Sequence, residues 1–156
     1  ALGALDSGKV AAVGVSNFLP SQVSLLRQHL GVPLAVNQIE LSLATMTALD
    51  NGVLDQCQQW GIVPMAWSPL AGGALFGDSP LAHRLAPELG RVARLHGCTP
   101  DAVALAWLMR LPARVVPVLG SARIERIRDA WAATRIELSR EDWYSLWTAA
   151  ADRPLP

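Results

Sequence analysis

The sequence predicts an α/β fold in which helices cover a parallel β-sheet, and three observations carry that prediction. Four short apolar runs lie along the chain, and segments with helical spacing separate each run from the next. Apolar strands joined through helices are typical of parallel sheets. No G-x-G-x-x-G motif opens a helix after any run, which counts against an open dinucleotide-binding sheet. A complete (β/α)8 barrel needs eight strands and about 250 residues, so this chain of 156 residues is expected to be half of such a barrel.

The first three strands are expected at VAAVGVS, LAVNQIEL and IVPMAW, which span 10–16, 34–41 and 62–67. Aliphatic and β-branched residues dominate these runs, as they do in buried strands. A helix is expected from Pro20 to His29, and a second over 52–61, where Gly61 ends the helical pattern. The segment 68–80 is rich in glycine and proline and is expected to be a loop.

Two helices are expected between the third and fourth strands, over 81–96 and 101–111. Thr99 is expected to be the N-cap of the second helix, with Pro100 at its first helical position. The fourth strand is expected at RVVPVLG, which spans 114–120.

Two more helices are expected after the fourth strand. Ser121 is expected to cap the first of them, which ends near Thr134. Ser139 and Asp142 form an S-x-x-D pattern similar to a capping box, which indicates the start of the last helix.

The composition excludes several functional classes. The net charge is zero, whereas a general nucleic-acid surface needs a basic excess. No apolar run approaches the roughly 20 residues of a membrane span, and no signal peptide opens the chain. Cys57 and Cys98 do not stand in a metal-ligand spacing, and no metal site is expected. We expect them to be reduced thiols of a cytoplasmic protein.

Polar residues follow the apolar runs where a barrel would carry its chemistry, at the carboxyl ends of the strands. Ser16 and Asn17 end the first run, and Gln38 lies inside the second. Gln38 is either a core amide satisfied by Asn17 or by backbone, or a ligand contact. Trp67 ends the third run, and it is either a core residue or a flat surface for a ring. The glycines of the following loop allow backbone to approach a ligand closely.

The end of the fourth run combines features of an anion site. Gly120 and Ser121 precede a helix, and Arg123 and Arg126 lie in its first turns. Free backbone N–H groups, the helix dipole and guanidinium groups attract phosphate. The alternative is an ordinary solvated helix face with paired charges.

Four motifs in this order, GVSNF, NQIELS, PMAWSPLAGG and VPVLGSARIERI, resemble the second half of the aldo-keto reductase superfamily. The resemblance covers essentially the whole chain, 1–156, as one domain. It implies a (β/α)8 barrel of which this chain supplies the last four strands with their helices. It also implies NADP(H) as cofactor and a small-molecule carbonyl substrate, as in the bacterial oxidoreductases of the superfamily.

The resemblance assigns cofactor contacts residue by residue. Ser16, Asn17 and Gln38 match residues that hydrogen-bond the nicotinamide carboxamide, and Trp67 matches the aromatic residue that stacks on the ring. The residues matched to the pyrophosphate loop are Ser68, Pro69 and Leu70. The residues matched to the adenosine-phosphate site are Gly120, Ser121, Arg126 and Asp129, and Arg123 is expected to supplement Arg126. The chain departs from the family twice, because Gly120 replaces a frequent lysine and Ala130 replaces a frequent asparagine.

The family's proton-donating tyrosine, with its lysine, aspartate and histidine, comes from the first half of the barrel. Tyr144 is expected to pack in the last helix, and Lys9 lies in the turn before the first strand, at the wrong end of the barrel. His29, His83 and His96 lie in helices or at their ends. We therefore expect no catalytic residue in this chain, which alone is inactive.

Three interpretations remain open from the sequence. The chain is a fragment of a complete reductase, since it begins with Ala1 in an apparent mid-helix. Alternatively, it is a genuine short protein, a half-barrel that binds nucleotide or a partner without catalysis. In the third interpretation, two half-barrels pair to form a pseudo-barrel. An isolated half-barrel has open edges and an uncovered inner face, so we expect it to self-associate.

Overall fold

The computed structural model describes residues 3, 5 and 7–151, and it contains one four-stranded parallel sheet in the order β1-β2-β3-β4. The strands are β1 (Val13–Ser16), β2 (Leu34–Glu40), β3 (Val63–Trp67) and β4 (Val116–Pro117). Each strand pairs with the next one along the chain, with helical crossovers between them. The predicted α/β fold with a parallel sheet is confirmed.

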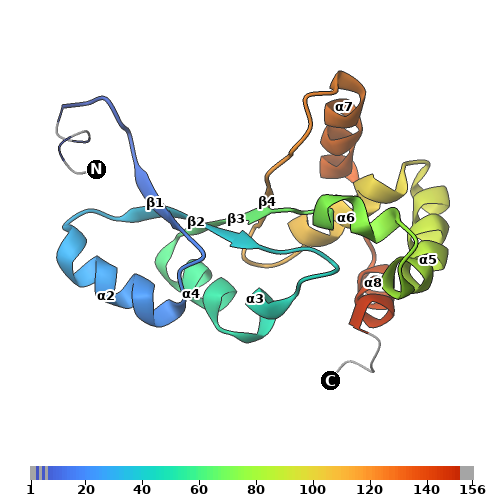
Figure 1. Cartoon of the computed structure of the whole chain (residues 1–156), viewed down its shortest axis with the longest axis horizontal. Helices are drawn as coiled ribbons and strands as arrows, with labels where there is room; N and C mark the ends of the chain where they lie inside the picture. Colours follow the sequence, from blue (N-terminus) through green and yellow to red (C-terminus); the bar gives the residue numbers. More distant parts are fainter. Residues whose placement is uncertain (1–2, 4, 6, 152–156) are drawn as a thin grey trace.

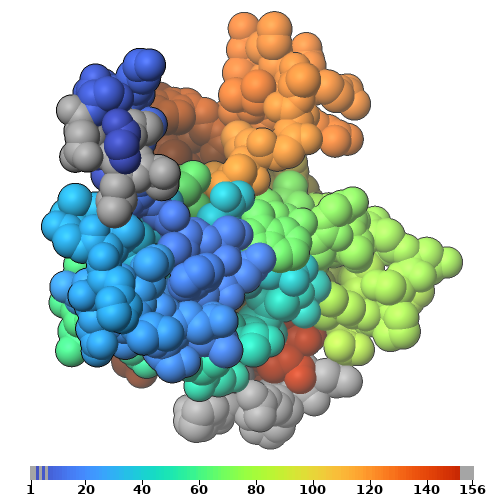
Figure 2. All heavy atoms as spheres, turned by 60° about the vertical axis from the view of Figure 1, so that its left-hand side comes forward, coloured from blue at the N-terminus to red at the C-terminus, as the bar shows by residue number. Residues whose placement is uncertain are grey.

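Helices cover one face of the sheet and extend beyond β4. They are α2 (Pro20–Leu30), α3 (Thr47–Asp50), α4 (Val53–Trp60), α5 (Pro80–His96), α6 (Pro100–Met109), α7 (Ile124–Ala132) and α8 (Arg140–Ala151), with 3-10 turns η1 (Ala71–Phe76) and η2 (Ala133–Arg135). Figure 1 shows α2 and α4 beneath the sheet, and α5, α6 and α8 gathered past β4. Helix α7 has no buried residue and projects from the body (Figures 1 and 2).

Several predicted boundaries are wrong. The fourth strand has two residues instead of seven, because left-handed backbone at Arg114 precedes it and its partner β3 ends at Trp67, before the left-handed Ser68. The last hydrogen bond to β3 runs from the Val118 N–H to the Ala66 carbonyl at 2.8 Å, and Pro117 is tolerated because β4 is an edge strand. The helix expected from Ser121 begins at Ile124, with Arg123 as its N-cap, and ends at Ala132. The first strand begins at Val13, so it is also shorter than predicted. The segment 41–51 contains the short helix α3, which was not predicted. The segment 68–80, expected to be a loop from its glycine and proline content, contains η1.

The two faces of the sheet have different surroundings. On one face, Ile39 and Ala66 are buried beneath the helices. On the other face, the paired register runs from Ser16 to Gln38, on to Met65 and then to Val116. This second face is open, and Val116 retains 46% of its exposure. In a barrel it would be the interior, so the described sheet has the form of a partial barrel.

A pair of indoles joins α6 to α8. Trp107 is fully buried and stacks on Trp143 with ring centroids 5.3 Å apart. The indole N–H of Trp107 donates to the Trp143 carbonyl at 3.1 Å, and that of Trp143 donates to the Trp107 carbonyl at 3.0 Å. Both polar ends of the stack are therefore satisfied inside the core.

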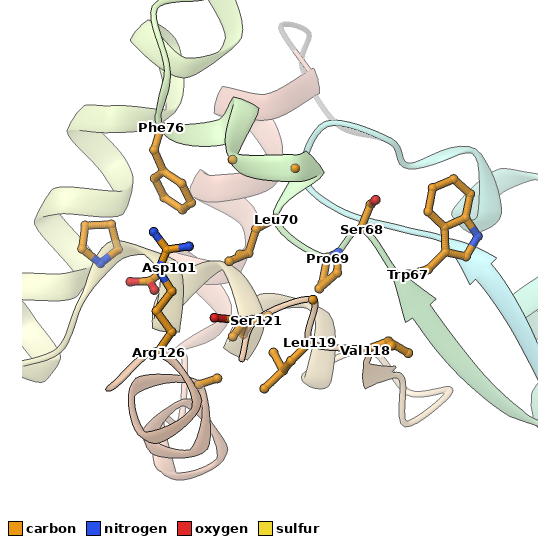
Figure 3. Close-up of a pocket in the computed structure, with 16 residues that line it drawn as sticks. Trp67, Ser68, Pro69, Leu70, Phe76, Asp101, Val118, Leu119, Ser121 and Arg126 are labelled. Atoms are coloured by element: carbon orange, nitrogen blue, oxygen red, sulfur yellow. The ribbon is translucent and has the colours of Figure 1, made fainter. Parts of the chain in front are cut away.

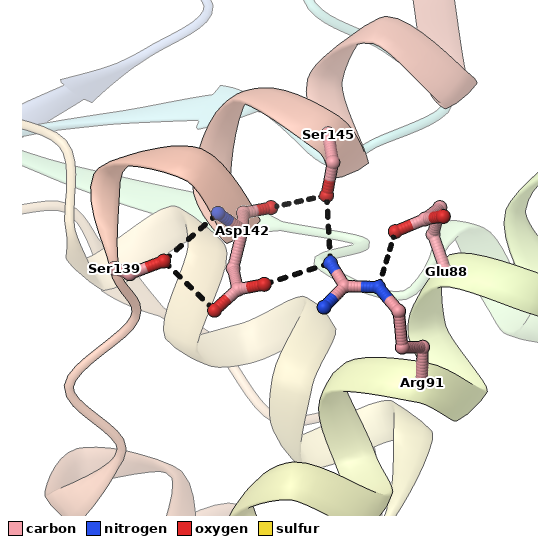
Figure 4. Close-up of polar contacts among 5 residues, drawn as sticks. All are labelled: Glu88, Arg91, Ser139, Asp142 and Ser145. Atoms are coloured by element: carbon pink, nitrogen blue, oxygen red, sulfur yellow. Dashed lines mark hydrogen bonds and ion pairs between the residues drawn. The ribbon is translucent and has the colours of Figure 1, made fainter.

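A polar network joins α5 to the start of α8 (Figure 4). Arg91 Nη2 donates to Asp142 Oδ1 at 2.7 Å, and Ser139 Oγ donates to Asp142 Oδ2 at 2.8 Å. The Asp142 backbone N–H donates to Ser139 Oγ at 3.0 Å, so Ser139 caps α8 as predicted. This network and the indole pair hold α8 against the helices that support β4.

Candidate functional site

The carboxyl ends of β1, β2 and β3 meet at one edge of the sheet and are joined by hydrogen bonds. The Asn17 backbone N–H donates to the Gln38 carbonyl at 2.8 Å, and Ser16 Oγ donates to the same carbonyl at 3.1 Å. The Trp67 indole N–H donates to Asn17 Oδ1 at 3.0 Å. The structure thus brings together the four residues that were matched to the nicotinamide end of the cofactor site.

Two of these strand ends have an unusual backbone conformation. Asn17 has φ of 57° and Ser68 has φ of 48°, both in the left-handed region. Asparagine tolerates this region well and serine less so. Such strained residues cluster at functional sites, where the surrounding structure holds them. Here Asn17 and Ser68 directly follow the last residues of β1 and β3, so the chain turns out of the sheet at both positions.

The amides of β2 have opposite roles. Asn37 is 1% exposed, donates from Nδ2 to the Phe18 carbonyl at 2.9 Å, and accepts from the Phe18 backbone N–H at 3.4 Å. Gln38 points to the open face, and its side-chain amide makes no hydrogen bond within the described residues. Asn37 is therefore the satisfied core amide, while Gln38 is free to bind a ligand. The strand alternation could have identified Asn37, since neighbouring residues face opposite sides.

A cavity of about 640 Å³ begins at Trp67 and extends beneath η1 to α7 (Figure 3). Its lining residues are Trp67, Ser68, Pro69, Leu70, Gly72, Gly73, Phe76, Pro100, Asp101, Leu105, Val118, Leu119, Gly120, Ser121, Arg126 and Ala130. Its walls come from the loop after β3, the start of α6, the segment after β4 and one face of α7. This volume is within the usual range of cofactor and small-molecule sites.

Seven of the twelve residues predicted from the sequence line this cavity: Trp67, Ser68, Pro69, Leu70, Gly120, Ser121 and Arg126. Ser16, Asn17 and Gln38 lie beyond it, joined to Trp67 through the Asn17 hydrogen bond. Arg123 and Asp129 do not line the cavity. Arg123 is an exposed N-cap residue whose backbone N–H donates to Ser121 Oγ at 3.2 Å, while α7 directs Arg126 and Ala130 toward the cavity.

Some of the lining residues could not be read from strand ends. Pro100 and Asp101 open α6, and packing of that helix against α5 brings its first turn to the cavity. Phe76 closes η1 and is 44% exposed at the cavity. Among the described lining residues, only Arg126 and Asp101 carry a charge. The cavity therefore has an aromatic end at Trp67 and a charged end at α7.

The two ends of the cavity offer different chemistry to a ligand. Trp67 and the strand-end amides can hold a flat ring that carries an amide group. Ser121 and Arg126 can hold a phosphate, and the φ values of 62° at Gly72 and 96° at Gly73 let the backbone pass close to the ligand between them. These features define an α/β-barrel type of protein with an elongated ligand site at the carboxyl ends of its strands.

Comparison with known proteins identifies the family. The Aldo/keto reductase family model matches residues 3–150, and the chain belongs to this family. It is 47% identical over 144 residues to a "6-dehydroglucose reductase" of Agrobacterium fabrum, covering 92% of this chain and 48% of that protein. It is 42% identical over 152 residues to "Oxidoreductase YdhF" of Escherichia coli, covering 97% of this chain and 51% of that protein.

A solved structure shows the same fold. The thermostable aldo-keto reductase Tm1743 superposes with a TM-score of 0.84 at 27% identity, over 95% of this chain and 52% of that one. The chain therefore has the (β/α)8-barrel type of fold, with four of the strands. It spans about half the length of the curated relatives that it matches.

Proposed function

We propose that this chain is the cofactor-binding half of an NADP(H)-dependent aldo-keto reductase. The reaction is hydride transfer between the nicotinamide and a carbonyl or alcohol substrate. The observation that carries the proposal is one continuous cavity, which runs from the Trp67 end of the sheet to Ser121 and Arg126 on the far side. Family membership and relatives named as reductases support the reaction class.

The residues present fit a nicotinamide dinucleotide at both ends. The Gln38 amide has no protein partner among the described residues, and a carboxamide has the donor and acceptor that would satisfy it. Asn17 Oδ1 already accepts from Trp67, so its amide plane is held and its Nδ2 can donate to the same carboxamide. At the other end, Arg126 supplies a planar cation suited to a phosphate.

In this proposal the chain binds and orients the cofactor. The bound cofactor supplies or accepts the hydride. Ser16, Asn17 and Gln38 would fix the rotation of the nicotinamide by holding its carboxamide. Trp67 would pack against one face of the ring and leave the other face to the substrate. The loop after β3 would cover the pyrophosphate and exclude water there.

The proton donor is assigned to a first half of the barrel that this chain does not contain, so the chain alone is inactive. Tyr144 packs in α8 with Trp143 and Trp147, at ring-centroid distances of 5.1 Å and 6.0 Å. Lys9 precedes β1, at the amino ends of the strands. Neither can reach the carboxyl ends of the strands, where a substrate would meet the nicotinamide.

The substrate is proposed to be a small carbonyl compound, and 6-dehydroglucose is the first to assay because two relatives, at 47% and 40% identity, are named for it. None of the described helices is long and apolar enough to cross a membrane. We propose that the protein is cytoplasmic, in keeping with the free thiols of Cys57 and Cys98.

The proposed cofactor role is tested by replacing Arg126, the residue expected to contact the phosphate. Arg126→Ala should weaken NADPH binding by about 1–3 kcal/mol through loss of a charge-assisted hydrogen bond, and NADH binding far less. Arg128→Ala is the matched control, since Arg128 is an exposed arginine of α7 that does not line the cavity. Titration of cofactor fluorescence measures both. Equal losses for the two cofactors would contradict the assigned role of Arg126.

A second measurement separates the enzyme from a non-catalytic half-barrel. The mass of the native polypeptide in its source cells is read by mass spectrometry on a peptide from this region. A mass about twice 16.7 kDa fits a complete reductase. A mass near 16.7 kDa would overturn the enzymatic proposal and leave a nucleotide-binding or regulatory half-barrel.

A further inference from the structure

The charged end of the cavity contains an acidic side chain, Asp101, which lies outside the four motifs described above. Asp101 lies in the first turn of α6, is half-buried, and lines the cavity together with Arg126. Figure 3 shows Arg126 extending from α7 into the cavity, toward the wall that carries Asp101 and Phe76. The formal charge of the described lining residues is therefore zero at the end where a phosphate would bind.

Helix stability alone explains an acid in a first turn, because a carboxylate there complements the helix dipole. The same rule is met by Asp55 in α4 and Glu125 in α7. Both of those are exposed and neither lines the cavity, whereas Asp101 does. A carboxylate on a cavity wall interacts electrostatically with any ligand that binds there. Asp101 therefore affects ligand binding in addition to stabilising the start of α6.

That consequence concerns the ribose 2′ position of the cofactor, which is the only difference between NAD(H) and NADP(H). A carboxylate repels a 2′-phosphate, and it can accept a hydrogen bond from a 2′-hydroxyl. Gly120 stands where the family often has a lysine, so this wall also lacks the second cation that would offset the repulsion. Among the described lining residues, Arg126 is the only cation that favours the phosphate.

We propose that Asp101 is a cofactor-specificity residue of this site: its carboxylate opposes the 2′-phosphate and accepts a hydrogen bond from the 2′-hydroxyl, so that the site takes NAD(H) as well as NADP(H). The proposal rests on the proposed cofactor function of the cavity. It deepens that function, because it assigns the choice of dinucleotide to the balance between Asp101 and Arg126.

The experiment uses adenosine 5′-monophosphate and adenosine 2′,5′-bisphosphate as probes, since both occupy only the adenosine end of the cavity. Calorimetric titration of the full chain with each probe measures the two dissociation constants and their ratio. Asp101→Asn should raise the preference for the bisphosphate about tenfold, by tightening the bisphosphate and weakening the monophosphate. The tightening should shrink as the salt concentration rises, because salt screens the charge.

Three variants serve as controls. Asp55→Asn removes an acid from the first turn of α4, away from the cavity, and should leave the ratio unchanged. Asp101→Glu keeps the charge and should retain the wild-type ratio within about threefold. Asp101→Ser is the second neutral variant, since serine is also well tolerated near a helix start, and it should match Asp101→Asn. Circular dichroism verifies that each variant is folded.

The outcomes separate this proposal from the one on which it rests. If the wild-type chain binds the probes and neither neutral variant changes their ratio, the role of Asp101 is refuted and the cofactor site stands. If a neutral variant weakens both probes equally, Asp101 binds the adenine, and the specificity role is again refuted. If neither the wild-type chain nor any variant binds either probe or NADPH, both the cofactor site and the specificity role of Asp101 are refuted.

Discussion

Removal of the Asp142 carboxylate should loosen α8 from α5 and measurably destabilise the protein. The carboxylate is 9% exposed and accepts from Arg91 at 2.7 Å and from Ser139 at 2.8 Å. Asp142→Ala leaves the Ser139 hydroxyl without its acceptor at the start of α8. Hydrogen bonds to a charged group contribute about 1.5–3 kcal/mol each when they are buried.

The magnitude depends mainly on the Ser139 bond. The Arg91 side chain is 45% exposed, so water can solvate its guanidinium after the substitution, and the ion pair adds little. We therefore expect Asp142→Ala to lower the free energy of unfolding by about 2 kcal/mol. Glu88→Ala, which removes only the exposed side of the same network, should change it by less than about 0.5 kcal/mol.

The effect should also depend on pH. Burial raises the pKa of the Asp142 carboxyl, but the hydrogen bonds from Arg91 and Ser139 and the nearby positive charge outweigh burial, so the pKa lies below its ordinary value. A lowered pKa stabilises the folded state above the ordinary value, and this contribution is lost as the pH falls through the folded value. The difference between wild type and Asp142→Asn should therefore be full above about pH 5 and shrink below about pH 4.

Urea unfolding followed by circular dichroism measures these free energies at pH 7 and across the acid range. Asp142→Ala and Glu88→Ala with equal effects at pH 7 would show that the buried carboxylate has no special role. A difference between wild type and Asp142→Asn that is constant from pH 7 to pH 3 would refute the lowered pKa.

Three further predictions follow from particular residues. Trp67→Ala should weaken NADPH binding about fivefold or more through lost ring contact, whereas Trp131→Ala, whose side chain is 66% exposed, should not, and fluorescence titration distinguishes them. Burial raises the pKa of Cys57 to about 11, so iodoacetamide should modify it at pH 8 far more slowly than a free cysteine, as mass spectrometry of the labelled peptide would show. The isolated 156-residue chain should self-associate through its open sheet face, and a sharp monomer peak in light scattering with cooperative unfolding would contradict this.

The order of elements could be predicted because each strand is apolar along its length and each helix has its own start and stop residues. Thr99 and Pro100 at the start of α6 and Ser139 at the start of α8 are examples, and both starts are confirmed. The length of the last strand, β4, could not be predicted in this way. The run at 114–120 is as apolar as the others, but only two of its residues pair with β3.

The family motifs allowed the site to be located from the strand ends, since these ends meet at one edge of any parallel barrel sheet. The motifs do not show which of two neighbouring polar side chains faces the ligand site. Asn37 and Gln38 are adjacent amides, and only the register of β2 against its neighbours shows that Asn37 is buried and Gln38 faces the open side. The assignment of contacts to the cofactor stays a prediction.

The sequence by itself determined the class of fold, the family and the position of the strand-end motifs, because all three depend on local patterns of residues. Tertiary structure alone decided which side chains share a cavity. Asp101 shares the cavity with Arg126 because α6 packs against both β4 and α7. Arg123 lies outside the cavity, and α7 begins two residues later than a cap at Ser121 predicts. Such encounters depend on how helices pack over long distances in the chain, and no local pattern contains that information.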